Sequence, residues 1–157
     1  MASSGPRPSV RDTSEGLALS RRRPYNRRLV KVLALDYGPA RTGVAVSDAT
    51  GTVARPLEVV ERAASVEGLG RIVQLVRDQG ARRVVVGLPL TLSGEVGEQA
   101  RATEEFLAAL RERLDVPVET YDERFTTKLA GPGGDDARAA AFLLSGYLEW
   151  RESRGER

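Results

Sequence analysis

Apolar and polar residues follow each other in short, regular runs from residue 29 onward, and these runs predict five strands. Continuous apolar runs of about four to eight residues, bounded by turn-forming residues, are typical of buried strands. The five runs that fit this description are Val30–Asp36, Thr42–Ser47, Thr52–Val60, Ala81–Leu88 and Pro117–Tyr121.

Three helices are predicted where apolar residues recur at intervals of three and four. The first begins at Ser65, a residue type that caps helices, and ends before Gly80, a common helix stop. The other two run from about Val96 to Leu114 and from about Asp136 to Arg151. The predicted element order is therefore β-β-β-α-β-α-β-α.

This order predicts an α/β fold with a mixed five-stranded sheet. The short links at residues 38–41 and 48–51 favour antiparallel hairpins among the first three strands. Pro56 is typical of an edge strand, and the nearly all-apolar fourth strand is typical of a sheet that is buried on both faces. Helices that alternate with the later strands should pack against this sheet. The same order of elements occurs in ribonuclease H-like folds.

Residues 1–28 differ from the rest of the chain, being rich in Ser, Pro, Gly and Arg without apolar periodicity. They hold seven arginines and two acidic residues, a net charge of +5, which leaves −3 for the remaining chain since the total is +2. We therefore predict a disordered basic arm (1–28), one folded domain (29–152) and a disordered tail (153–157). The arm either contacts nucleic-acid phosphates or is a dispensable tail, and we favour the second interpretation.

The chain has no apolar run near the roughly 20 residues that cross a membrane, and its N-terminus lacks the apolar region of a secretory signal. It also contains no cysteine. These features favour a cytoplasmic protein with no membrane partner.

Histidine is absent as well, which narrows the available chemistry. An imidazole general base, a Ser-His-Asp triad and zinc sites built from His or Cys are all excluded. Catalysis would have to use carboxylates, Lys or Arg, hydroxyls or a bound ion. Carboxylates with a hard, oxygen-preferring cation, Mg²⁺ or Mn²⁺, are the leading option.

Acidic residues occur at the ends of three predicted elements. Asp36 closes the first strand, Asp122 and Glu123 follow the fifth strand, and Asp135 and Asp136 open the last helix. Helical spacing places Asp136 on the apolar face of that helix, whereas Asp135 suits the N-cap. Carboxylates that converge at one sheet edge repel one another unless cations lie between them. Such a cluster suits two-metal hydrolysis of phosphodiester bonds.

Each acidic position also has a purely structural interpretation. Asp36 could simply begin the Gly-Pro turn, and the helix acids could merely complement the helix dipole. Glu123 could form a surface ion pair with Arg124 or Arg41. The segment at Ser47 and Asp48 is either a neighbour of the site or a hairpin turn.

Four blocks of sequence, in order, resemble the signature motifs of the YqgF family, the Holliday-junction-resolvase-like proteins that are also called pre-16S rRNA nucleases. The resemblance spans about residues 31–148. The blocks are Asp36-Tyr-Gly-Pro-Ala-Arg-Thr-Gly-Val-Ala-Val-Ser-Asp48, Gly87-Leu-Pro-Leu-Thr-Leu-Ser-Gly94, Asp122-Glu-Arg-Phe-Thr-Thr127 and Asp136-Ala-Arg-Ala-Ala-Ala-Phe-Leu-Leu-Ser-Gly-Tyr-Leu148.

The resemblance implies a ribonuclease H-like fold and a cytoplasmic, metal-dependent endonuclease that acts in maturation of the 5′ end of pre-16S ribosomal RNA. It places the catalytic and metal-binding carboxylates at Asp36, Glu123 and Asp136, which would hold two Mg²⁺ or Mn²⁺ ions. Substrate contacts are expected at Arg41 and around Gly87. Arg124 is either a phosphate contact or an ion-pair partner of Glu119 or Asp122, and Gly87 is alternatively an ordinary strand exit.

Two other functions remain open from the sequence. One is cleavage of structured DNA such as a four-way junction, which would require a dimer; the sequence shows no reliable dimer surface, so the oligomeric state is undetermined. The other is a non-catalytic RNA-binding module of ribosome assembly. An actin-like kinase, whose first phosphate motif is similar, is disfavoured because it needs two such domains.

The chain departs from the family between Thr127 and Asp136, where a Gly/Pro bridge of eight residues replaces a longer, often basic segment. Fully extended, such a bridge spans about 26–29 Å, so Asp136 can still reach the sheet edge. One hypothesis is that the arginine-rich arm supplies the missing basic surface.

Deletion of residues 1–28 tests the arm. If the arm is dispensable, as we favour, RNA affinity and the slope of log K against log salt concentration should not change, because no phosphate contact is lost. Fluorescence anisotropy over a salt series measures both quantities. A shallower slope in the shortened chain would instead assign phosphate contacts to the arm.

Overall fold

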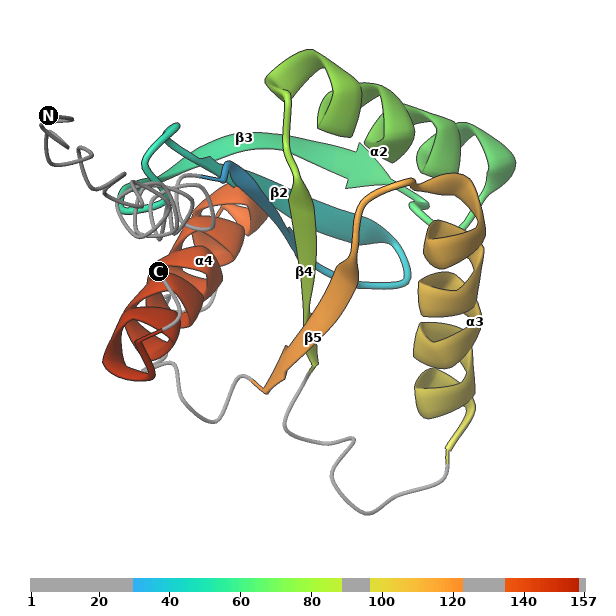
Figure 1. The fold of residues 1–157 in the computed structure, drawn as a ribbon. Coiled ribbons are helices and arrows are strands. Elements are labelled where there is room, and N and C mark those ends of the chain that lie inside the picture. Colours follow the sequence, from blue (N-terminus) through green and yellow to red (C-terminus); the bar gives the residue numbers. More distant parts are fainter. Residues whose placement is uncertain (1–29, 89–96, 123–134, 156–157) are drawn as a thin grey trace, which may run out of the picture.

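The structure, a computed structural model, describes residues 30–88, 97–122 and 135–155 and contains the predicted elements in the predicted order (Figure 1). The predicted arm (1–28) lies outside the described residues. Ser153, assigned to the tail from the sequence, is instead the last residue of the final helix. The strands are β1 (Val32–Asp36), β2 (Arg41–Ser47), β3 (Ala54–Glu61), β4 (Arg83–Leu88) and β5 (Val118–Asp122). The helices are α2 (Val66–Gln79), α3 (Glu98–Arg113) and α4 (Asp136–Ser153).

The five strands form one mixed sheet in the order β3-β2-β1-β4-β5. β1 and β2 are antiparallel, as are β2 and β3, whereas β1, β4 and β5 run parallel. The mixed sheet predicted from the sequence is confirmed. Pro56 lies in β3, which is an edge strand, as its ring and missing N–H require.

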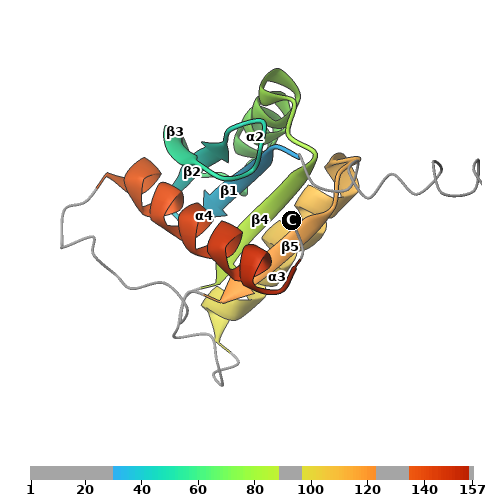
Figure 2. The ribbon, with the colours of Figure 1, turned by 60° about the vertical axis from the view of Figure 1, so that its left-hand side comes forward.

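Helices cover both faces of this sheet. α4 lies across one face, and α2 and α3 lie on the other (Figures 1 and 2). The central strand β1 shows this division, because Leu33 and Leu35 pack in the cluster with α2 and α3 while Val32 and Ala34 pack in the cluster with α4. All four side chains are fully buried. Alternate residues of β1 therefore belong to two separate hydrophobic cores, one on each face of the sheet.

The starts of α2 and α4 and the end of α2 lie where the sequence predicts, and each is capped by the expected residue. Ser65 Oγ accepts a hydrogen bond from the Gly68 N–H at 3.0 Å, and Asp135 Oδ1 accepts one from the Ala137 N–H at 3.1 Å. Gly80 ends α2 with a φ of 66°, a left-handed conformation that glycine adopts without steric cost. In the described ranges, no helix is long and apolar enough to cross a membrane.

The segment at Ser47 and Asp48 is a hairpin turn and lies at the opposite end of the sheet from Asp36. Ser47 follows the residue paired with Leu33, and its Oγ accepts a hydrogen bond from the Val32 N–H at 2.8 Å. Asp48 accepts hydrogen bonds from the N–H groups of the residues that close the turn, Thr52 and Val53, at 2.9 and 3.0 Å.

The hydrogen bonds of Asp48 should make the stability of the hairpin depend on pH. Hydrogen bonds from the Thr50 hydroxyl and from the backbone lower the pKa of Asp48 to about 2. A carboxyl whose pKa is lowered by folding stabilises the protein above its ordinary pKa, and this contribution disappears as the pH falls through the folded-state value. Asp48→Asn should thus lower the free energy of unfolding by about 1 kcal/mol at pH 7, after allowance for solvent screening.

Urea unfolding of both proteins at pH 7, 4 and 2 measures this difference, which should vanish near pH 2. Asp115→Asn, at an exposed acid outside the hairpin, is the matched control. A difference that stays constant across the three pH values would contradict the assignment.

Candidate functional site

The three parallel strands end at one edge of the sheet, and candidate residues from separate parts of the sequence meet there. Asp36, the last residue of β1, pairs with Gly87 of β4, and Leu88 pairs with Asp122, the last residue of β5. Asp36 and Asp122 are partly buried, and Gly87 is buried. In sheets with parallel strands, this carboxyl edge is the usual position of ligand sites.

Asp36 lies on the α4 side of the sheet. Alternation along β1 places it with Val32 and Ala34, which pack under α4. Asp136 is the first residue of that helix. The backbone of Asp136 lies directly on Gly43, the β2 residue that pairs with Asp36. The structure therefore brings two segments that are far apart in the sequence, the end of β1 with Asp36 and the start of α4 with Asp136, to the same sheet edge.

The two acids at the start of α4 differ as their spacing predicts. Asp135 is exposed and caps the helix. Asp136 is partly buried and shares the helix side that carries the buried residues Ala140, Leu143 and Tyr147. Asp136 therefore lies on the face of α4 that packs on the sheet.

Asp122 belongs to the other side of the sheet. Val118 packs in the cluster with α2 and α3, whereas Tyr121 packs under α4, so alternation places Asp122 on the side of Val118. Glu123 and Arg124 lie outside the described residues. Within the ranges that the structure describes, no group of three or more His, Cys, Asp or Glu residues could hold a metal ion.

Arg41, the first residue of β2, is exposed and lies at the same sheet edge, two residues beyond Gly43. The turn that links it to Asp36 is tight, because a β-carbon added to Gly38 would lie 2.5 Å from the Arg41 carbonyl oxygen. Arg41 therefore begins β2 at the sheet edge where β1 ends with Asp36.

Sequence reasoning missed two residues at this edge, Gly43 and Tyr37. A glycine inside a strand is a signal of close backbone approach, and Gly43 has that role. Tyr37 follows Asp36 and stacks on Phe106 of α3 with ring centroids 4.2 Å apart. Burial, and secondarily the charge of Glu105, raises the pKa of Tyr37. This stacking packs the residue that follows β1 against α3.

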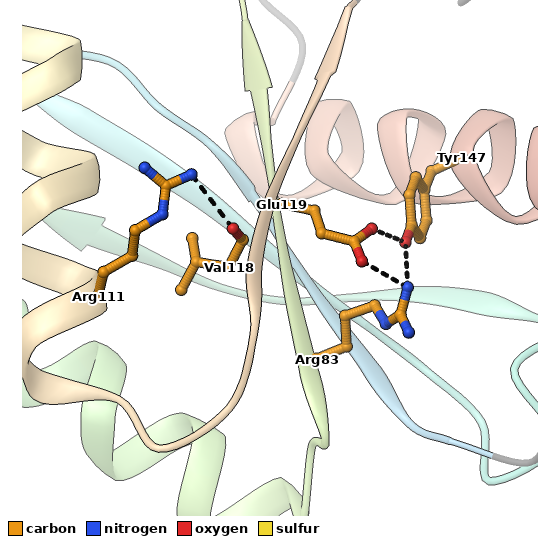
Figure 3. Close-up of polar contacts among 5 residues, drawn as sticks. All are labelled: Arg83, Arg111, Val118, Glu119 and Tyr147. Carbon is orange, nitrogen blue, oxygen red and sulfur yellow. Dashed lines mark hydrogen bonds and ion pairs between the residues drawn. The ribbon is translucent and has the colours of Figure 1, made fainter. Parts of the chain in front are cut away.

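A second polar cluster lies between the sheet and α4, away from the carboxyl edge (Figure 3). Arg83 Nη1 donates to Glu119 Oε1 at 2.6 Å, and the Tyr147 hydroxyl donates to Glu119 Oε2 at 2.6 Å. Burial, followed by the hydrogen bond to Glu119, raises the pKa of Tyr147 to about 12. Of the two partners that the sequence suggested for Arg124, Glu119 is thus bonded to Arg83 and Tyr147. Because the charge of Glu119 is neutralised by Arg83, we interpret this cluster as a structural link between α4 and the sheet rather than as a reaction centre.

Comparison with solved structures establishes the class of fold. The chain resembles a structure titled "T. thermophilus RuvC in complex with Holliday junction substrate", with a TM-score of 0.54 and 20% sequence identity. The match covers 79% of this chain and 96% of that chain. The fold is ribonuclease H-like, as the order of elements predicted.

Comparison of sequences establishes the family. The chain belongs to the family described as "RuvX: Holliday junction resolvase", which matches residues 30–150. Two similar relatives are both named "Putative pre-16S rRNA nuclease". One, from Desulforudis audaxviator, is 42% identical over 79% of this chain and 97% of the relative. The other, from Rubrobacter xylanophilus, is 47% identical over 76% of this chain and 92% of the relative. The family assignment made from the four sequence blocks is confirmed.

Tyr147→Phe separates the structural cluster from the candidate site. Loss of the hydroxyl leaves one Glu119 oxygen without its donor, so the free energy of unfolding should fall by about 1–2 kcal/mol. Nuclease activity at a temperature where both proteins are folded should not change. Urea unfolding and a cleavage assay measure the two quantities. A large loss of activity in a folded variant would assign the cluster to the active site.

Proposed function

We propose that this protein is a metal-dependent endonuclease that hydrolyses phosphodiester bonds and acts in maturation of the 5′ end of pre-16S ribosomal RNA. The nuclease class rests on family membership. The observation that supports the site is the contact of the Asp136 backbone with Gly43, the strand partner of Asp36, at the carboxyl edge of the sheet. The names of the relatives support the ribosomal RNA substrate and, with it, a cytoplasmic location.

The donor set at this edge fits Mg²⁺ or Mn²⁺. Both ions prefer carboxylate oxygens, and the site offers two partly buried carboxylates from different elements. Two such charges held together repel each other, and a divalent cation between them removes this cost. When bound, two ions would lower the pKa of an attacking water and stabilise the leaving oxygen. Asp36 and Asp136 would hold and orient them.

We propose Glu123 as the third carboxylate. It follows Asp122, which ends β5 at the same sheet edge as Asp36. Asp122 itself is the weaker choice, because alternation places it on the α2 and α3 side of the sheet. The third metal-binding carboxylate is therefore assigned to the next residue in the sequence, Glu123, rather than to Asp122.

Substrate contacts in this proposal come from Arg41, Arg124 and the backbone around Gly87. Arg41 is exposed at the sheet edge where β1 ends with Asp36, so its guanidinium is available to a phosphate next to the cleaved bond. Gly87 has no side chain to block close approach of a nucleic-acid backbone, and it pairs with Asp36. Precursor ribosomal RNA is the proposed partner.

A second candidate function is cleavage of structured DNA. The family description names a Holliday junction resolvase, and the RuvC structure was solved with that substrate. The chemistry would be the same, and only the substrate would differ. A third candidate is a non-catalytic role in ribosome assembly. The net charge of −3 outside the arm favours it, because a negatively charged domain binds nucleic-acid phosphates weakly and so holds a substrate poorly for cleavage.

The first test is cleavage of a ribosomal precursor RNA and of a four-way DNA junction with Mg²⁺, Mn²⁺ or EDTA. Asp36→Asn and Asp136→Asn should each lower the cleavage rate more than about a hundredfold, because a metal ligand is lost. Binding of Mn²⁺, measured by calorimetry, should weaken in parallel. Circular dichroism should show that both variants remain folded.

Asp135→Asn is the matched control. It removes a charge from the residue next to Asp136, but asparagine caps a helix as well as aspartate does. Its activity should equal that of the unchanged protein. Full activity of Asp36→Asn would reject the proposed site, and RNA binding without cleavage by the unchanged protein would favour the assembly role.

A further inference from the structure

Gly43 occupies a position where no other residue fits. A β-carbon added there would lie 1.8 Å from the Asp136 carbonyl oxygen, 2.4 Å from its carbonyl carbon and 3.1 Å from the Ala137 nitrogen. All three atoms belong to the backbone of the first turn of α4. Because such contacts are essentially never shorter than 3.0 Å, a side chain at Gly43 would displace this turn by at least about 1.2 Å.

The strand cannot yield to relieve such a contact. Gly43 is paired on one side with Asp36 and on the other with Val59. Its neighbours Thr42 and Val44 are fully buried. Movement of β2 would therefore break hydrogen bonds to two strands and disturb packing on both faces of the sheet.

The rest of α4 cannot follow the first turn either. Ala140, Leu143 and Leu144 are buried against the sheet in the middle of the helix. Farther along, Tyr147 is bonded to Glu119 and stands beside Arg83 (Figure 3). The displacement would thus be concentrated at the N-terminal turn, which carries Asp136.

We propose that Gly43 is a positioning residue of the active site: by lacking a side chain, it sets the separation between Asp36 and Asp136. Gly43 is the β2 partner of Asp36 and also contacts the backbone of Asp136, so one residue sets the spacing of the two backbone positions that carry the carboxylates. This inference rests on the proposed function, in which the two carboxylates hold divalent cations. Metal geometry tolerates only small errors in ligand position, so a displaced turn weakens binding.

Gly43→Ala tests the proposal. The Mn²⁺ concentration that gives half-maximal cleavage should rise about tenfold or more, and Mn²⁺ affinity measured by calorimetry should fall by the same factor. Cleavage at saturating Mn²⁺ should recover most of the loss. A residue that only supports the fold would not shift the metal dependence of a protein that remains folded.

Gly68→Ala is the matched control. A β-carbon there would lie 2.3 Å from the Arg62 carbonyl oxygen, again a backbone atom, but at the start of α2 on the other side of the sheet. It should lower stability while leaving Mn²⁺ affinity unchanged. If Gly43→Ala does not fold, Ala137→Val enlarges a buried residue of the same turn and should weaken Mn²⁺ binding in the same way.

The outcomes separate this inference from the proposed function. Wild-type Mn²⁺ affinity in folded Gly43→Ala or Ala137→Val, with loss of binding in Asp36→Asn and Asp136→Asn, would overturn the positioning role alone. Wild-type affinity in both aspartate variants would overturn the metal site itself. An equal loss of affinity in Gly68→Ala would show a general effect of stability and would also overturn the positioning role.

Discussion

The burial of β1 between two layers of helices is the constraint on which the rest of the structure depends. Its first four side chains are fully buried, two on each face, and it pairs with β2 on one side and β4 on the other. A strand so enclosed can place a charged residue only at its end. Asp36 is that residue, and its position at the sheet edge follows from the core behind it.

Both ends of α4 are attached to the sheet, but by different kinds of interaction. At the N-terminal end, the backbone of Asp136 lies on Gly43, where shape alone fixes the distance. At the far end, the ion pair and hydrogen bonds among Arg83, Glu119 and Tyr147 join the helix to β4 and β5 (Figure 3). The helix thus acts as a rigid support that carries a carboxylate to a set position.

The two polar regions near α4, the Arg83–Glu119–Tyr147 cluster and the carboxyl edge of the sheet, differ in how their charges are balanced. In the cluster of Arg83, Glu119 and Tyr147, the charge of Glu119 is balanced by Arg83 at 2.6 Å, which lowers the cost of partly burying both groups. At the carboxyl edge, the proposed function instead requires Asp36 and Asp136 to hold two charges of the same sign near each other. A fold that holds like charges at one place gains by binding a cation, and this difference distinguishes the proposed reaction centre from the structural link.

The sequence by itself determined the eight elements of the described residues, the caps of α2 and α4 and the mixed sheet, because apolar periodicity and residues such as Ser65, Gly80 and Asp135 act locally. It also nominated Asp36 and Asp136 from their positions at element ends. The contact at Gly43 and the partners of Glu119 were decided only by the tertiary structure. Both join segments far apart in the chain, and no local pattern encodes which backbone will pack on a glycine or which arginine will pair with a partly buried acid.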